Sequence, residues 1–455
     1  MNVMAMIYMA FLFLAIAASS RMRPVQAVTL VYLAGIVFLP VSPPVDNLPS
    51  LESAGASPYW VMPAALPADI FFTKAAIASL AALLVALLFG RSRLNGFRFH
   101  WADLPILAWC LWPLLQSLWV DASPAGWHSS LYLFCVWGIP WFLGRIYLAN
   151  RNDQLIFVRH FVGLSLLLLP IILFETVSEV RLHELVYGPH PFADVGAQRY
   201  FGYRPLAFFE DGNQYGLWIA SAALLAIWRA KHAAAAGRSR SQLAVALLLL
   251  VMAIASQSAG ALILLFAGLM LMLFPPAFRL LRKAAVPALV LFGALMAVYL
   301  SGALPLRTIA KETTAGQIVW STLRASGRGS LAWRIGQDQK TLPAIKEHIV
   351  AGSGQWDWWR ELGKRPWGLP LLMIGQFGLI GFGLAAAIAL RALWIQISSR
   401  VEEEVSGSRT RNPAAVLAIL LVMALIDAML NAFLIMPAIM AAGAISVVRS
   451  RRRSE

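Results

Sequence analysis

The stretch LPLLMIGQFGLIGFGLAAAIAL, residues 369–390, runs for 22 residues without an Asp, Glu, Lys, Arg or His. A helix needs about 20 apolar residues to cross the hydrocarbon core of a bilayer. The chain repeats this pattern of apolar stretch and polar loop, and 60% of its 455 residues are hydrophobic while 13% are charged. Such a composition excludes a soluble globular domain in practice.

We therefore predict an all-α fold, a polytopic bundle of about 12–13 transmembrane helices with a large periplasmic loop that contains short helices. The predicted spans are 4–19, 25–42, 69–90, 104–120, 129–148, 155–175, 213–230, 243–256, 259–277, 285–303, 368–397, 413–431 and 432–448. Two of them, 243–256 and 432–448, are short, which leaves a count of twelve open.

These spans divide the chain into four parts. Residues 1–303 hold the first helices and a periplasmic loop, 176–212. The large periplasmic loop follows at 304–367, the C-terminal helices at 368–448, and a basic cytoplasmic tail at 449–455.

The basic residues show which side of the membrane each loop faces. Nearly all short loops of one side contain Lys or Arg, whereas 43–68, 121–128 and 257–258 on the other side contain none. This is the positive-inside pattern, which places the C-terminus in the cytoplasm. Loops 176–212 and 304–367 nevertheless hold thirteen of the 37 basic residues on the outer side, which predicts that an anion binds there.

The composition also bounds the partners. The net charge of +15 would suit a nucleic-acid binder, but most basic residues lie in loops that face anionic lipid headgroups, so we expect membrane lipids and no nucleic acid. Cys110 and Cys135 fall inside apolar spans and are read as core residues. The seven histidines show no metal-ligand spacing, so no metal and no cofactor is expected.

The first candidate site is RYFGYRPLAFFEDGNQYG, residues 199–216. Arg199 and Arg204, with Asn213 at the start of the following helix, form a set of donors suited to a phosphate or a sugar. The alternative is that both arginines only pair with acidic neighbours, which are Asp194, Glu210 and Asp211.

The second candidate site lies in the large loop. Arg334 could reach the same anion, and Gly352 and Gly354 permit a tight return of the backbone. Trp358 and Trp367 belong to a tryptophan cluster that anchoring at the membrane interface explains better than sugar stacking does, but aromatic faces also suit sugar rings and the two roles are compatible.

The same loop contains an amphipathic segment that we expect to lie at the outer membrane surface. Its apolar residues are spaced as one helical face, which Gly336 and Pro343 are expected to break. These apolar residues are Leu331, Ile335, Leu342, Ile345 and Ile349.

Ionisable residues inside predicted spans need a partner, because an isolated charge is costly in hydrocarbon. Lys74, Arg159 and Asp427 are of this kind. Asp427 is followed one turn later by Asn431, and a structural ion pair and a functional group are both open at that position.

Taken in order, these segments resemble the O-antigen ligase and O-antigen or exopolysaccharide polymerase superfamily of bacterial inner membranes. The similarity covers roughly 195–385 and rests on Arg199 to Gly216, on Arg334 with the turn at Gly352 to Gly354, and on Gly378-Leu379-Ile380-Gly381. The tail element 427–445 is also similar. Where the family has a histidine this chain has Trp367, and Gln376 and Ala259 replace an acidic residue and an arginine.

The resemblance implies a multi-pass glycosyltransferase of surface polysaccharide synthesis. It would move a sugar chain from undecaprenyl pyrophosphate to an acceptor hydroxyl at the periplasmic face, as a polymerase rather than a ligase because the histidine is missing. Arg204, Arg199 and Arg334 would bind the pyrophosphate, and the tryptophan-rich loop around Asp357 would bind the acceptor. A chain-length regulator and a flippase are the implied protein partners.

Because the family histidine is replaced, the base must be another group of the outer loops. His348, Asp357 and Glu361 are the predicted catalytic candidates, with His183 and His190 as further options. Two alternatives remain, a transporter or flippase of an anionic lipid-linked saccharide and a degenerate family member without catalysis.

Overall fold

The computed structural model describes most of the chain as helix. The described residues are 3–41, 71–120, 126–190, 198–199, 201–233, 239–274, 276–301, 312–314, 316–318, 321, 329–363, 365–405, 412–431, 433 and 436–446. The predicted outer loop 43–68, the tail 449–455 and Asp194 lie outside these residues. Within them the strands form one hairpin, in which β1 (Gln198–Arg199) pairs antiparallel with β2 (Gly202–Tyr203).

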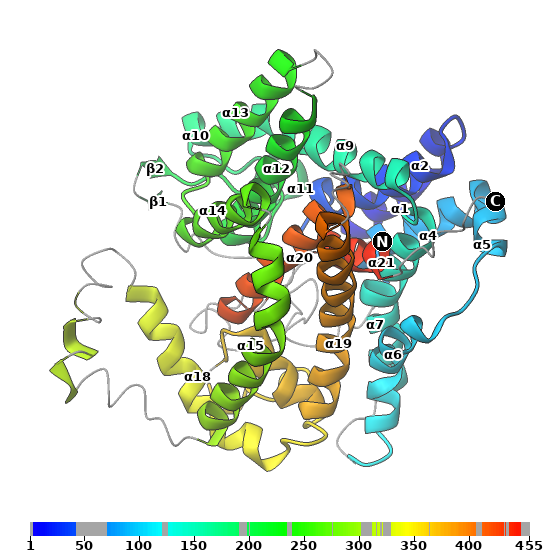
Figure 1. Cartoon of the computed structure of the whole chain (residues 1–455). Helices are drawn as coiled ribbons and strands as arrows, with labels where there is room; N and C mark the ends of the chain where they lie inside the picture. Colours follow the sequence, from blue (N-terminus) through cyan, green and yellow to red (C-terminus); the bar gives the residue numbers. More distant parts are fainter. Residues whose placement is uncertain are drawn as a thin grey trace.

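Each of the thirteen predicted spans coincides with a helix or with consecutive helices (Figure 1). The N-terminal set is α1 (Val3–Ser19), α2 (Pro24–Phe38), α4 (Lys74–Phe89), α5 (Arg91–Asn95), α6 (Leu104–Gln116), α7 (Gly126–Leu133), the π-helical turn Phe134–Gly138, α8 (Ile139–Tyr147), α9 (Arg151–Leu167), α10 (Leu169–Ser178) and α11 (Leu182–Tyr187). The C-terminal set is α12 (Gly212–Ala233), α13 (Ser239–Ala255), α14 (Ala259–Leu273), α15 (Pro276–Ser301), α18 (Gly329–Glu347), α19 (Leu369–Val405), α20 (Pro413–Leu430) and α21 (Met436–Ile445). The all-α prediction is therefore confirmed.

Two of the described helical segments are long and apolar enough to cross a membrane. They are Arg151–Ser178, which joins α9 to α10, and Leu369–Ser398 within α19. The other apolar helices of the described part are shorter, at 10–17 residues, and α1, α2, α4 and α20 are among them.

One large apolar core joins the helices. Buried side chains of α2, α4, α6, α8, α9, α12, α20 and α21 form a single cluster. In Figure 1, α15 stands at the edge of this assembly, where it packs against α19.

The helix α19 is broken near its start. Gly378 has φ +70°, and the backbone groups freed by the break bond to the returning loop: Ser353 N–H donates to the Gly375 carbonyl and Leu379 N–H to the Ile349 carbonyl. From α6, the buried Gln116 side chain donates to the Gln376 carbonyl at 2.6 Å. Irregular backbone is tolerated inside a bundle only when other groups satisfy it in this way.

Two glycines make this pairing possible. A Cβ on Gly352 would lie 2.3 Å from the Gln376 carbonyl oxygen, and one on Gly378 would lie 2.1 Å from that of Val350. Both have positive φ, and so does Gly354, which bears out the tight return predicted for Gly352 and Gly354.

The prediction that Gly336 and Pro343 break the amphipathic segment is wrong. α18 continues through both residues. Leu342 and Ile345 are buried against Leu371 and Ile374 of α19, and this packing offsets the hydrogen bond that a proline cannot donate.

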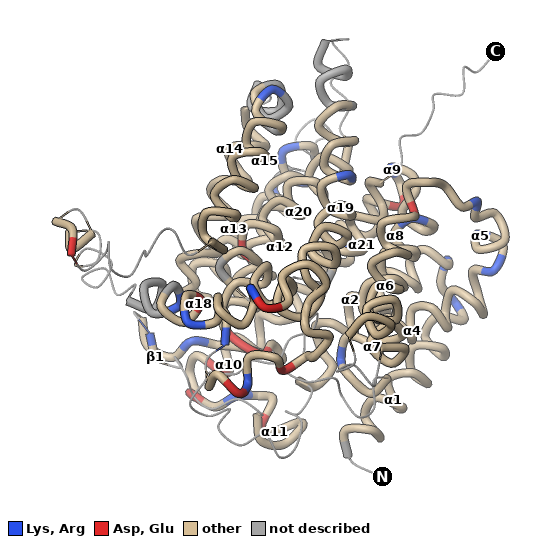
Figure 2. The backbone as a smooth tube through the Cα atoms, turned by 90° about the horizontal axis from the view of Figure 1, so that it is seen from below, with Lys and Arg blue, Asp and Glu red and all other residues tan. Residues whose placement is uncertain are grey.

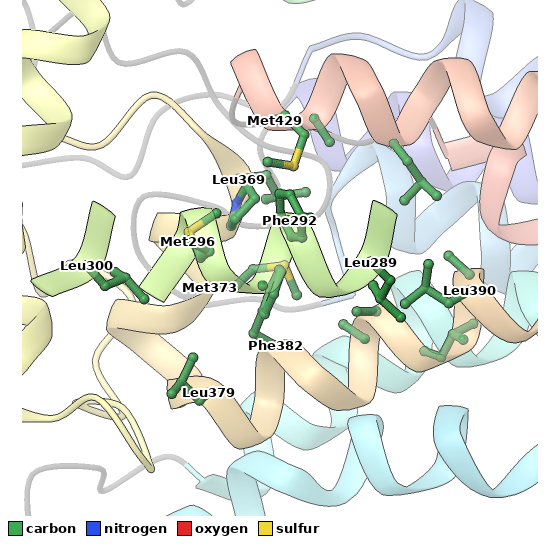
Figure 3. Close-up of a pocket in the computed structure, with 18 of the residues that line it drawn as sticks. Leu289, Phe292, Met296, Leu300, Leu369, Met373, Leu379, Phe382, Leu390 and Met429 are labelled. Atoms are coloured by element: carbon green, nitrogen blue, oxygen red, sulfur yellow. The ribbon is translucent and has the colours of Figure 1, made fainter. Parts of the chain in front are cut away.

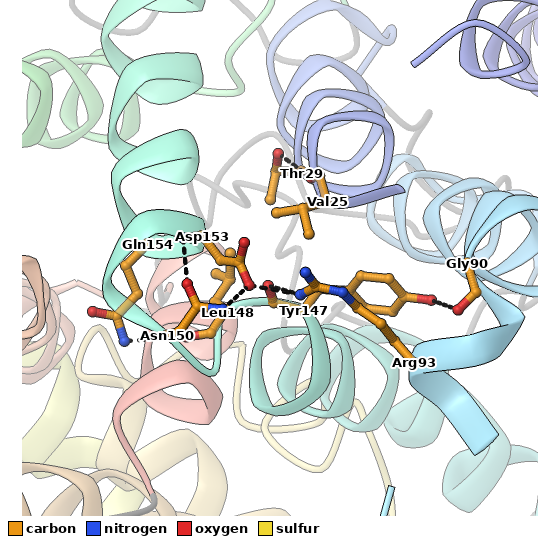
Figure 4. Close-up of polar contacts among 9 residues, drawn as sticks. All are labelled: Val25, Thr29, Gly90, Arg93, Tyr147, Leu148, Asn150, Asp153 and Gln154. Atoms are coloured by element: carbon orange, nitrogen blue, oxygen red, sulfur yellow. Dashed lines mark hydrogen bonds and ion pairs between the residues drawn. The ribbon is translucent and has the colours of Figure 1, made fainter. Parts of the chain in front are cut away.

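Charged residues gather at the two ends of the assembly. In Figure 2 the end with α10, α11 and β1 carries both signs, whereas α5 carries basic residues. Near α5, Arg93 Nη1 lies 2.6 Å from Asp153 Oδ2, and Asn150 caps α9 through the N–H of Asp153 (Figure 4). This network ties α5 to the start of α9.

Candidate functional site

Arg334 of α18 is at the centre of the candidate site. Its Nη1 donates to Asn431 Oδ1 at 2.7 Å, and its guanidinium carbon lies 5.3 Å from the centre of the Trp367 ring. Asn431 follows the last residue of α20, and Trp367 precedes α19 by two positions. Arg334 thus joins three segments that are distant in the sequence, and its contact with Trp367 is within the range of a cation–π interaction.

Asp338, one turn after Arg334, holds Trp367 in place. Its Oδ1 accepts the N–H of Trp367 at 2.6 Å. Burial raises the pKa of Asp338 to about 6, against the opposing effect of the N–H groups of Trp367 and Gly368. The side chain is therefore ionised at neutral pH and changes charge in mildly acidic solution.

Further charged groups lie close to Arg334. Burial lowers the pKa of Arg334, the carboxylates of Asp211 and Asp427 oppose that change, and Arg199 adds to it. Arg199 is exposed on β1, and Asp211 accepts the N–H groups of Asn213 and Gln214 at the start of α12. Arg199 and Arg334 thus lie close enough to interact electrostatically, as the sequence analysis expected.

Arg204 is placed differently from the other two arginines. It is 4% exposed, its Nε donates to the Ser256 carbonyl at 2.9 Å, and its Nη2 donates to Asn213 Oδ1 at 3.2 Å. These bonds fasten the start of α12 to the corner between α13 and α14. Arg204 is therefore a buried residue that holds the start of α12 in position.

A second side chain of the same corner, Gln257, also binds this loop. In the structure Gln257 also receives the N–H of Phe201 on its Oε1 at 3.0 Å. The corner residues 256–258 thus position the loop that carries Arg199 and Arg204.

Glu175 organises the remainder of this loop. Its Oε2 accepts the N–H groups of Leu206 and Ala207, both at 2.8 Å, and its Oε1 accepts that of Leu182 at 2.9 Å. The side chain is fully buried. A single carboxylate at the end of α10 therefore pulls two parts of the loop against the bundle.

The two histidines of this loop have structural partners. His183 Nε2 accepts the N–H of Val41 at 3.1 Å, so its Nδ1 carries the proton and donates to the Gly188 carbonyl. Burial, with the charges of His190 and Lys74, lowers the pKa of His183 to about 3. His190 Nε2 lies 3.3 Å from the Phe209 carbonyl. Both rings are used to hold the loop.

The three residues predicted to be catalytic are not brought to the arginines. His348 and Glu361 are exposed, and Asp357 pairs with Arg360 at 3.0 Å. The contacts of Arg334 described above are with Asn431 and Trp367, and none of the three residues takes part in them. Trp358 also packs away from Arg334, because its Nε1 donates to the Leu372 carbonyl at 3.3 Å and its ring covers Gly375.

An apolar cavity of about 880 Å³ lies beside the charged cluster, between α15, α19, α20 and α21 (Figure 3). Leu369, Ala428 and Met429 line it, and these residues adjoin Trp367, Asp427 and Asn431 in the sequence. Side chains of α15 close the opposite wall, among them Leu289, Phe292 and Met296. The cavity and the charged cluster together form an amphiphilic site.

Sequence reasoning missed two members of this cluster. Asn431 was noted only beside Asp427, and Asp338 was not singled out, although it stands four residues after Arg334 on one helical face. Among the described residues no group of His, Cys, Asp and Glu could hold a metal ion. No protein-family model, no curated protein and no solved structure matches this chain.

Proposed function

We propose that the protein is a polytopic inner-membrane glycosyltransferase of surface polysaccharide synthesis, with an undecaprenyl-pyrophosphate-linked saccharide as donor. The observation that carries the proposal is the contact of Arg334 with Trp367 and Asn431 beside an apolar cavity. A lipid pyrophosphate has a long apolar tail and an anionic head, and it needs both surfaces next to each other. The order of sequence motifs adds the reaction class.

Each part of the substrate has a place in this proposal. The isoprenoid tail occupies the cavity along α15 and α19. The pyrophosphate meets the donors of Arg334 and Arg199, while Arg204 keeps the start of α12 in position. The ring of Trp367 orients the guanidinium of Arg334, and the cationic groups stabilise the charge of the leaving pyrophosphate.

The membrane orientation belongs to the same proposal. Loops 176–212 and 304–367 face the periplasm, and the C-terminus is cytoplasmic. A transporter of saccharides would need a polar path through the bundle, whereas the cavity is lined almost wholly by apolar side chains. This favours an enzyme that holds a lipid tail.

The test is binding of a defined probe to the purified full-length protein. We expect wild-type protein to bind farnesyl diphosphate, which combines an isoprenoid tail with a diphosphate. Arg334→Ala should weaken binding roughly 10- to 150-fold, because a charge-assisted contact contributes about 1.5–3 kcal/mol. Arg334→Lys should bind farnesyl diphosphate more tightly than Arg334→Ala and more weakly than wild type, since lysine keeps the charge but lacks the planar fork of donors.

Arg91→Ala is the matched control, because Arg91 is exposed on α5. It should bind farnesyl diphosphate as wild type does. Equal dissociation constants for Arg334→Ala and Arg91→Ala would show that Arg334 does not bind the anion. A separate assay with a lipid-linked saccharide and saccharide acceptors then tells a polymerase from a ligase by the product formed.

A further inference from the structure

Asp427 is a buried acid that the proposed function has not yet used. It lies near the end of α20, a helix with an otherwise apolar sequence, and is 5% exposed. An ionised carboxylate is energetically costly in such surroundings, so a structural or functional role is expected for it. No ion pair joins it to a basic residue among the described residues.

The surroundings of Asp427 orient one oxygen, and the other has no hydrogen-bond partner among the described residues. Asn431 Nδ2 donates to Asp427 Oδ1 at 3.0 Å, and Oδ1 of the same Asn431 accepts from Arg334 Nη1 at 2.7 Å. Oδ2 of Asp427 is buried and accepts no hydrogen bond from any described residue. Asn431 thus couples the carboxylate to the arginine and fixes its direction.

The position of Asp427 also suits the reacting bond. The next two residues, Ala428 and Met429, line the apolar cavity, and Arg334 interacts electrostatically with Asp427. A lipid whose tail fills the cavity and whose pyrophosphate meets Arg334 therefore carries its first sugar within reach of this end of α20.

The other two acids near Arg334 hold parts of the fold through backbone N–H groups, whereas the partner of Asp427 is a side chain. Asp338 Oδ1 accepts the N–H of Trp367, and Asp211 Oδ1 accepts two N–H groups of α12. A base needs an oxygen that is oriented, close to the reacting atoms and not committed to the fold. Asp427 meets these conditions.

We propose that Asp427 is the general base of the transfer and that Asn431 is its positioning residue, an inference that rests on the proposed function. The acceptor hydroxyl gives its proton to Asp427 Oδ2. Its oxygen forms a bond to the anomeric carbon of the lipid-linked sugar while the bond from that carbon to the pyrophosphate oxygen breaks. The pyrophosphate keeps the electron pair of the broken bond and stays bound at Arg334.

The experiment separates turnover from binding. Full-length variants are compared in native cells that lack the chromosomal copy, by the amount of surface polysaccharide at equal protein level, and after purification by binding of farnesyl diphosphate. We expect Asp427→Asn to lower polymer about 10²–10⁴-fold, the usual contribution of a general base. Its dissociation constant for farnesyl diphosphate should remain within about twofold of the wild-type value. Asp427→Glu should make measurably more polymer than Asp427→Asn, because it keeps a carboxylate.

The matched control is Asp153→Asn, which changes a buried acid at the opposite end of the molecule. It should retain both polymer and binding at equal protein level. The inference is overturned if Asp427→Asn makes normal amounts of polymer, if it loses binding of farnesyl diphosphate together with polymer, or if the Asn and Glu variants make equal amounts. If wild-type protein itself does not bind farnesyl diphosphate, the proposed function fails first and the role of Asp427 fails with it.

Discussion

At the scale of single residues, the charges of the candidate site nearly cancel. Three arginines, Arg199, Arg204 and Arg334, lie near three aspartates, Asp211, Asp338 and Asp427. An excess of positive charge therefore does not explain the proposed binding of an anion. In this proposal the affinity for an anion depends on the direction of a few hydrogen-bond donors and on which of the three aspartates is ionised.

Asp338 supplies a pH test of this view. Because its pKa is raised to about 6, the carboxyl is ionised at pH 7.5 and mostly neutral at pH 5.5. Losing one negative charge near Arg334 should tighten anion binding by roughly three- to tenfold at the lower pH. Asp338→Asn keeps an oxygen for the N–H of Trp367, and it should bind tightly at both pH values.

The measurement is the dissociation constant of a farnesyl-pyrophosphate-linked sugar, a diester that does not titrate in this range. Parallel pH dependence in wild type and Asp338→Asn would assign the titration to another group. The dissociation constants should instead converge at pH 5.5 and separate at pH 7.5.

Part of this site could be predicted from the sequence. Arg199 and Arg334 stood out because the outer side otherwise avoids basic residues, and Asn213 because it begins a helix. Asp338 and Asn431 could not be assigned, since their roles depend on the return of Trp367 and on the end of α20 meeting α18. His348, Asp357 and Glu361 were chosen only as outer-loop groups able to act as a base; in the structure His348 and Glu361 are exposed and Asp357 pairs with Arg360.

At the scale of elements, apolar stretches predicted a helix at each of the thirteen spans, but not the break in α19. A run such as 369–390 reads as one helix, because glycine is common in helices of membrane proteins. The break requires hydrogen-bond partners from 349–354 and from Gln116, which no local pattern in α19 reveals. The sequence analysis also failed to predict that α18 continues through Gly336 and Pro343. The packing of α18 on α19 stabilises the helix by more than these two residues destabilise it.

We predict that Gly352→Ala and Gly378→Ala destabilise the protein. Positive φ alone lowers the free energy of unfolding by about 1–2 kcal/mol when the residue has a Cβ. The overlap of the added Cβ with carbonyl oxygens lowers it further. The thermal unfolding midpoint in detergent, followed by tryptophan fluorescence, should fall for both variants. Gly383→Ala is the control in the same helix, because an added Cβ there meets no atom within 4 Å. A midpoint unchanged in all three variants would contradict the role of the break.

At the scale of the whole molecule, the apolar core lies between two ends that differ in their charged residues. The broken start of α19 is held by the loop next to α18, and the other end of the bundle is tied by Arg93 and Asp153. The proposed orientation places the first end in the periplasm and the second in the cytoplasm.

Single cysteines test this orientation. Gln355 and Ser92 are exposed at opposite ends, and the native Cys110 and Cys135 are buried. In intact spheroplasts, Gln355→Cys should react with a membrane-impermeant maleimide, whereas Ser92→Cys should react only after permeabilisation. The reverse pattern would invert the topology, and equal labelling of both in intact cells would contradict a membrane between them.

The break in α19 also determines how the chain can be assembled. On the proposed topology α19 crosses the membrane, and if it entered the bilayer alone the carbonyls of Gly375 and Gln376 would have no partners, at a cost of several kcal/mol each. The segment 349–354 that satisfies them is synthesised just before α19, so both must be inserted as one unit. A version of the protein expressed as two fragments must therefore be divided before residue 349, since a cut between the loop and α19 would separate a helix from its own hydrogen-bond partners.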